Sequence, residues 1–116
     1  MPLFLNEADV RQLLTMPLAI EAVEEAHREL SLANAFDVPR QRTRLPKMAL
    51  HILQGALPGR DAIGYKAYTS NRSGVRFLVH VFSVSTGMLR VVLEANLLGM
   101  MRTGAASGVA TRCLAR

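Results

Sequence analysis

The spacing of apolar residues changes near residue 37 and divides the chain into two parts. Before that point, apolar residues recur every three or four positions, as on amphipathic helices. Asn6 is a good N-cap for a first helix over about 7–14, and Thr15 or Met16 caps a second that continues to about Ala33. Pro17 falls in the first turn of the second helix, where its missing N–H does no harm. The pattern therefore predicts two helices at the start of the chain.

From about residue 43 the period is two, which is typical of strands. Strands are expected within 43–45, 49–53, 62–69, 77–84 and 88–95, separated by turns at 57–61, 70–74 and 85–87. From about Thr103 the chain is expected to be helical again. Two helices, four to five strands and a C-terminal helix indicate an α+β fold with a mixed or antiparallel sheet. Because no β-α-β alternation occurs, we expect no complete nucleotide-binding unit within these residues.

Composition narrows the class of protein. The chain has 116 residues, half of them hydrophobic, and one cysteine, which fits one globular domain in a reducing compartment. No apolar run is long enough to span a bilayer, and the acidic start does not resemble a signal peptide. We therefore expect a cytoplasmic location and no membrane association.

The net charge of +5 is unevenly distributed. Residues 1–37 carry a balance of −5 and residues 38–116 a balance of +10. Such a split indicates that the second part meets anions: small carboxylates, nucleotides or nucleic acid. The alternative is that the acidic first part neutralises it in the fold or in a dimer.

Arg102 and Thr103 precede a run rich in small residues, "GAASGVA". If a helix begins there, its free N–H groups and the Arg102 guanidinium would bind a carboxylate or phosphate. Thr103 would cap the helix or donate to the same anion. The alternative is a tightly packed helix with an exposed arginine.

Lys66 lies in the middle of an otherwise apolar strand, in "AIGYKAYT". A half-buried ammonium needs a partner, and a bound carboxylate or carbonyl would serve. The alternative is an edge-strand lysine that discourages aggregation.

Three arginines alternate in "VPRQRTRLP", at Arg40, Arg42 and Arg44. On a strand they would share one face and form an anion-binding stripe. Contact with nucleic-acid phosphates is a weaker hypothesis, because no aromatic residue is interleaved for base stacking. His27, His51 and His80 are scattered without metal-ligand spacing, so we expect neither a nucleic-acid partner nor a metal site.

Taken together, "FLNEADVRQLL", "VPRQRTRL", "LHIL", "GYKAYT" and "RTGAASGVATRCLAR" resemble the N-terminal part of the ornithine cyclodeaminase/mu-crystallin family, in order and spacing. The resemblance implies a homodimeric, two-domain, NAD- or NADP-dependent protein that acts on small amino or imino acids. The family includes cyclodeaminases, which are lyases, and oxidoreductases such as alanine dehydrogenases. Mu-crystallin, which binds thyroid hormone, provides the alternative of a non-catalytic ligand-binding module.

The resemblance also assigns roles to individual residues. It implies that Arg42, Lys66 and Arg102 hold the substrate carboxylate and carbonyl region, with Arg40 as the alternative to Arg42. Thr103 and Ser107 would lie near the nicotinamide. His51 falls near a position that the family fills with an acid, which puts ornithine-specific chemistry in doubt.

Family members continue beyond the position of Arg116 into a Rossmann domain with a glycine-rich fingerprint and a catalytic aspartate. We therefore expect residues 1–116 to be the substrate-binding and dimerisation segment of a two-domain enzyme. On this interpretation the segment holds no catalytic residue and is inactive alone.

Overall fold

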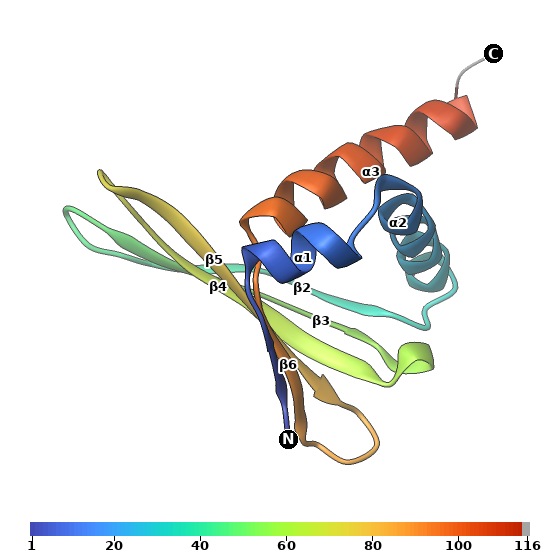
Figure 1. Cartoon of the computed structure of the whole chain (residues 1–116), viewed down its shortest axis with the longest axis horizontal. Helices are drawn as coiled ribbons and strands as arrows, with labels where there is room; N and C mark the ends of the chain where they lie inside the picture. The colour runs from blue at the N-terminus through green and yellow to red at the C-terminus, as the bar shows by residue number, and fades with distance from the viewer. Residues whose placement is uncertain (115–116) are drawn as a thin grey trace.

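Three helices lie on one face of a six-stranded sheet in the computed structural model, which describes residues 1–114 (Figure 1). The helices are α1 (Glu7–Leu13), α2 (Met16–Ser31) and α3 (Asn96–Leu114), with a short 3-10 turn, η1 (Pro58–Arg60). The strands are β1 (Leu3–Leu5), β2 (Phe36–Arg44), β3 (Ala49–Leu57), β4 (Ala62–Asn71), β5 (Gly74–Ser83) and β6 (Leu89–Glu94). This arrangement confirms the α+β class.

The sheet has the order β1-β6-β5-β4-β3-β2. Strands β2 to β6 form an antiparallel meander, and β1 pairs in parallel with β6. The predicted sheet of four to five strands therefore lacked one strand. Strand β1 is three residues long, too short to show a period of two, and only its pairing with β6 defines it.

The first two helices begin where the sequence predicts. Asn6 and Asp9 form a reciprocal capping box at α1, and the Thr15 hydroxyl accepts from the Leu18 N–H at α2. These caps satisfy backbone donors that a helix start leaves free, using residues three positions apart. Both starts are therefore encoded locally.

Helix α3 begins at Asn96, so the predicted start near Thr103 is wrong. The N-terminus of α3 is capped from the other end of the chain. The Glu7 carboxylate accepts from the N–H of Asn96 at 2.7 Å and from that of Leu97 at 3.1 Å. A negative charge at this position also suits the helix dipole.

Strand β2 is longer than the predicted 43–45 and begins at Phe36. It is an edge strand, and all nine of its residues are exposed. A register shift between Val38 and Gln41 accommodates Pro39, which has no N–H to offer the ladder. The proline therefore interrupts the pairing without ending the strand.

The small residues of α3 allow close packing against α2. A Cβ added at Gly104 or Gly108 would lie 3.4 Å from side-chain carbons of Met16 and Ile20 respectively, and Ala105 is fully buried. The predicted alternative of a tightly packed helix is therefore correct for these glycines.

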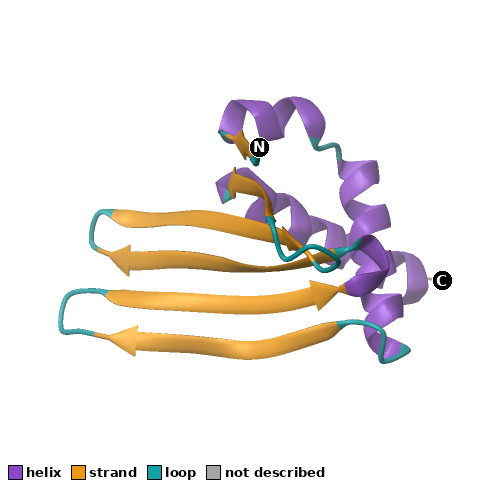
Figure 2. Ribbon diagram, turned by 90° about the horizontal axis from the view of Figure 1, so that it is seen from below, coloured by secondary structure: helices purple, strands orange, loops and turns teal. Residues whose placement is uncertain are grey.

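The helices cover only one end of the long strands. In Figure 2 the β2–β3 and β4–β5 hairpins project beyond the helices. The opposite face of the sheet has no helix on it in Figure 1 and carries apolar side chains, among them Leu50, Ile52, Ile63, Leu78 and Phe82. We call this side the open face and the other the helix face.

Candidate carboxylate-binding site

A cavity of about 490 Å³ lies where α2 and α3 meet the helix face. Val23 and Leu30 line it from α2, Arg102 and Ala106 from α3, and Leu53, Lys66 and Val79 from the sheet. Pockets of this size with mostly apolar walls and a few polar groups are typical of small-molecule sites. Two cations therefore meet at a cavity of suitable size.

Lys66 occupies the middle of β4, the strand between β3 and β5, so it is not an edge-strand lysine. Its Nζ lies 5.0 Å from the ring centroid of Phe77 and 5.7 Å from that of Tyr68, within cation–π distance. Partial burial lowers the pKa of Lys66, and the positive charges of Arg102 and Arg40 lower it further. An anion bound here would relieve that repulsion.

Arg102 reaches the cavity from the interior of α3, not from its first turn. The predicted anion site at a helix N-terminus is therefore wrong, because Glu7 already occupies the N–H groups at Asn96 and Leu97. Thr103 does not cap the helix; its hydroxyl donates to the Gly99 carbonyl at 2.9 Å. Thr103 and Ser107 are exposed, and neither lines the cavity.

Arg42 lies on β2 and contacts His51 of β3, its cross-strand partner. The Arg42 Nε donates to His51 Nδ1 at 3.2 Å. His51 Nδ1 is therefore unprotonated, and in the neutral ring Nε2–H donates to Ser70 Oγ at 2.9 Å. Burial and the charges of Arg42, Arg40 and Arg44 lower the pKa of His51, which keeps the ring neutral.

The His51 ring is held by packing as well. It stacks on Tyr68 with centroids 4.4 Å apart and planes inclined by 9°, and Tyr68 contacts Phe77 at 4.6 Å. Phe77 in turn lies below the Lys66 ammonium. One row of cross-strand neighbours therefore connects Arg42 to Lys66.

The predicted site residues are brought together only in part. Lys66 and Arg102 share the cavity, whereas Arg42 lies two strands from Lys66 and does not line it. Arg40 is close enough to Lys66 to affect its pKa. Sequence reasoning missed the His51–Ser70 contact, because only the register of β3 on β4 brings these residues together.

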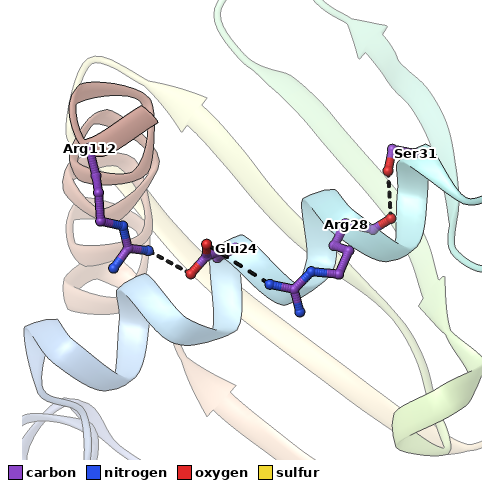
Figure 3. Close-up of polar contacts among 4 residues, drawn as sticks. All are labelled: Glu24, Arg28, Ser31 and Arg112. Atoms are coloured by element: carbon purple, nitrogen blue, oxygen red, sulfur yellow. Dashed lines mark hydrogen bonds and ion pairs between the residues drawn. The ribbon is translucent and has the colours of Figure 1, made fainter. Parts of the chain in front are cut away.

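The site cations lack carboxylate partners. Among residues 1–114 no carboxylate forms an ion pair with any of Arg40, Arg42, Arg44, Lys66 and Arg102. Other arginines have such partners: Arg28 and Arg112 both contact Glu24 (Figure 3), and Arg60 contacts Glu25. These five cations therefore have no ion pair that an external anion would have to displace.

Other kinds of site find little support in the part of the chain that the structure describes. No three His, Cys, Asp or Glu side chains there gather into a metal-binding group. None of its helices is both long enough and apolar enough to cross a membrane. It also contains no strand, glycine-rich turn and helix in succession, so these residues do not form a dinucleotide cradle.

The meander sheet, the helices on one of its faces and the cavity with two cations define a domain of α+β type. The model of the ornithine cyclodeaminase/mu-crystallin family matches residues 1–116, and the chain belongs to that family.

Known relatives agree with this assignment. The alanine dehydrogenase of Archaeoglobus fulgidus is 31% identical over 119 residues, which is 98% of this chain and 37% of the relative. The structure of a probable ornithine cyclodeaminase from Bordetella pertussis Tohama I matches with a TM-score of 0.95 and 27% identity, covering 100% of this chain and 37% of that one. An archaeal alanine dehydrogenase dimer with bound NAD matches with a TM-score of 0.91 and 31% identity, covering 99% and 38%. The chain thus spans little more than a third of its relatives' length.

Proposed function

We propose that residues 1–116 form the substrate-binding and dimerisation segment of an NAD- or NADP-dependent amino- or imino-acid dehydrogenase or cyclodeaminase. Lys66 and Arg102 bind the substrate carboxylate, and Arg42 contributes a third cation, with Arg40 as the alternative. The observation that carries this proposal is the convergence of Lys66 and Arg102, without carboxylate partners among residues 1–114, on a cavity large enough for a small amino acid.

The side chains have distinct tasks in this proposal. The Arg102 guanidinium offers parallel N–H donors that match the two oxygens of a carboxylate. The Lys66 ammonium, already partly desolvated, neutralises the carboxylate or polarises the neighbouring imine or carbonyl. The aromatic rings of Phe77 and Tyr68 limit its freedom, so little further ordering is needed when substrate binds.

A nicotinamide cofactor would supply the redox chemistry, and the family resemblance implies that it would bind in a part of the protein outside this segment. Residues 1–114 do not themselves provide its cradle. We propose that Thr103 and Ser107, on the exposed side of α3, lie near the nicotinamide in the longer protein.

A non-catalytic binding module is the second candidate. Both cations of the cavity and its apolar walls belong to residues 23–106, so a small carboxylate can bind there without a cofactor. Titrating NADH and L-alanine into the 116-residue chain separates the two functions. Alanine binding with no NADH binding fits the substrate segment of a larger enzyme, whereas NADH affinity equal to that of a complete family member contradicts it.

Arg102→Met and its matched control Arg112→Met test the site directly. In the complete enzyme, loss of the Arg102 charge should lower kcat/KM at least ~10²-fold, or about 2.7 kcal/mol of transition-state stabilisation. Arg112→Met lies on the same helix but removes only a contact with Glu24, so kcat/KM should not change. A near-wild-type value for Arg102→Met would remove Arg102 from the site.

We also propose that the chain forms a homodimer through the open face. Leu50, Ile63 and Leu78 are between 39% and 47% exposed there, and His80 Nδ1 is buried without a hydrogen-bond partner among residues 1–114. Leu78→Glu should convert a dimer to a monomer in light scattering. Val75→Glu, on the same strand with similar exposure but on the helix face, should leave the dimer intact.

A further inference from the structure

The contact between Arg42 and His51 bears on which amino-acid side chains the site accepts. Arg42 is anchored through its Nε, so its two terminal nitrogen atoms remain available. The anchor is a neutral imidazole, held by Ser70 at one edge and stacked on Tyr68. Arg42 is therefore positioned without losing its charge.

A carboxylate in the place of His51 would have a different effect. It would also accept from the Arg42 Nε, but it would form an ion pair and cancel the positive charge. Replacing an acid by an imidazole thus keeps the geometry of an anchored arginine and changes the electrostatics of the site.

The cavity, which Lys66 and Arg102 line, and strand β2 beside it together carry more positive charge than one carboxylate can neutralise. Five cations, Arg40, Arg42, Arg44, Lys66 and Arg102, lie on or beside the helix face. Asp37 is the one carboxylate among the residues that line the cavity, and it forms no ion pair with them. A substrate α-carboxylate contributes a single negative charge, so an excess of positive charge remains.

The excess charge lies along β2, away from Lys66. Arg42 pairs with His51 and Arg44 with Ala49, and successive residues on one face of a strand are separated by roughly 7 Å. Arg44 is the last residue of β2, next to the turn into β3, and the β2–β3 hairpin projects beyond the helices (Figure 2). A second anionic group several ångströms from the α-carboxylate would meet these arginines.

Resting on the function proposed above, we propose that His51 is a specificity-determining positioning residue. It fixes Arg42 as an uncompensated cation, and the site thereby prefers amino or imino acids with an anionic side chain over those with an aliphatic or cationic one.

The test uses three amino acids that share the α-carboxylate and α-ammonium groups and differ in side-chain charge. L-Aspartate, L-alanine and L-ornithine are titrated into the 116-residue chain by calorimetry at fixed pH and ionic strength. The expected order of affinity is aspartate, alanine, ornithine, with at least ~10-fold between the first two, the size expected for one added charge-assisted hydrogen bond.

Two nearly isosteric variants separate charge from positioning. His51→Gln retains a neutral acceptor for Arg42 and should keep the order of affinities. His51→Glu adds one negative charge at the same place and should lower the aspartate-to-alanine ratio at least ~10-fold. The ¹⁵N shift of the Arg42 Nε–H group reports whether Arg42 stays anchored, and circular dichroism confirms that each variant folds.

The possible failures are distinguishable. Equal binding of aspartate and alanine by the wild-type chain, or an unchanged ratio in a folded His51→Glu variant, would overturn the role of His51 and leave the proposed function intact. Failure of all three amino acids to bind would overturn the proposed function, and this inference with it.

Discussion

Two groups of basic residues in this domain differ in what they contact. Arg28, Arg60 and Arg112 contact Glu24 or Glu25 of α2. The unpaired group, which comprises Arg40, Arg42, Arg44 and Lys66 of the sheet and Arg102 of α3, has no carboxylate partner among residues 1–114. The acidic N-terminal part thus neutralises only some of the basic residues that follow it.

A cation that is paired with a carboxylate and one that lies near other cations differ in their capacity to bind an anion. The Arg60 Nε lies 3.0 Å from both carboxylate oxygens of Glu25, so this nitrogen already has an acceptor within the chain. Lys66 instead lies near cations: burial lowers its pKa, and the charges of Arg102 and Arg40 lower it further. Unrelieved repulsion between neighbouring cations at a cavity is a common mark of an anion site.

The largest effect on stability should follow from a substitution that disrupts the pairing of β4, the strand that carries Lys66, with β5. A Cβ at Gly64 would lie 2.1 Å from the His80 carbonyl oxygen, so Gly64→Ala must separate β4 from β5 and displace Lys66. We expect a loss of roughly 3 kcal/mol or more in the free energy of unfolding.

Gly59→Ala is the matched control, because no atom lies within 4 Å of a Cβ there. Urea denaturation measures both variants. Equal stability of the two would show that β4 and β5 do not approach as closely at Gly64 as described.

Local features predicted much of the fold. The starts of α1 and α2 follow from Asn6 and Thr15, whose caps involve residues only three positions away. The start of α3 could not be read in this way, because its cap, Glu7, lies 89 residues from Asn96. The short β1 and the passage of β2 through Pro39 likewise depend on neighbouring strands.

The candidate site was predicted from local signals. Lys66 was proposed because a charged residue interrupts an apolar strand, and Arg102 because it precedes a run of small residues; the structure places both at one cavity. The reason given for Arg102 was wrong in geometry, since it lies inside α3. The anchoring of Arg42 by His51 depends on strand register and two tautomer-defining contacts, which no local pattern encodes.

An effect of intermediate size is expected in the pH dependence of ligand binding by the unpaired group. Lys66 must be protonated to bind a carboxylate, and its pKa is lowered, so pyruvate affinity should fall as pH rises toward 10.5, earlier than for an ordinary lysine. Pyruvate is chosen because it has no amino group that titrates in this range. Calorimetry between pH 7 and pH 10 measures the affinity.

Lys47→Met, in the exposed loop after β2, should retain this pH dependence, and Lys66→Met should lose both the dependence and most of the affinity. Without ligand, the same lowered pKa means that the folded protein binds fewer protons than the unfolded chain near that pH. The stability contribution of Lys66 is therefore present above its ordinary pKa and lost as pH falls through the folded value. If the pyruvate affinity of Lys66→Met fell at high pH as that of the wild type does, Lys66 would not be the cause of that fall.

The smallest effect should come from the paired group. Glu24→Gln removes the acceptor charge of both Arg28 and Arg112 (Figure 3), and exposed ion pairs contribute about 0.5 kcal/mol or less each. Thermal unfolding should shift slightly, and alanine affinity should not change. A large loss of affinity in this variant would mean that the two groups of cations are not independent.

The contact of Glu7 with Asn96 and Leu97 makes the N-terminus of α3 depend on the first residue of α1. The N–H groups of Asn96 and Leu97 gain their Glu7 acceptor when these two parts of the chain meet. This cap therefore forms after a loop spanning most of the chain has closed. Removal of Glu7, or an extension that pulls β1 from β6, would fray the turns of α3 that precede Arg102. Substrate affinity would then report on the integrity of the N-terminus, far from the cavity in sequence. A tag placed at the N-terminus should therefore lower substrate affinity on the proposed function.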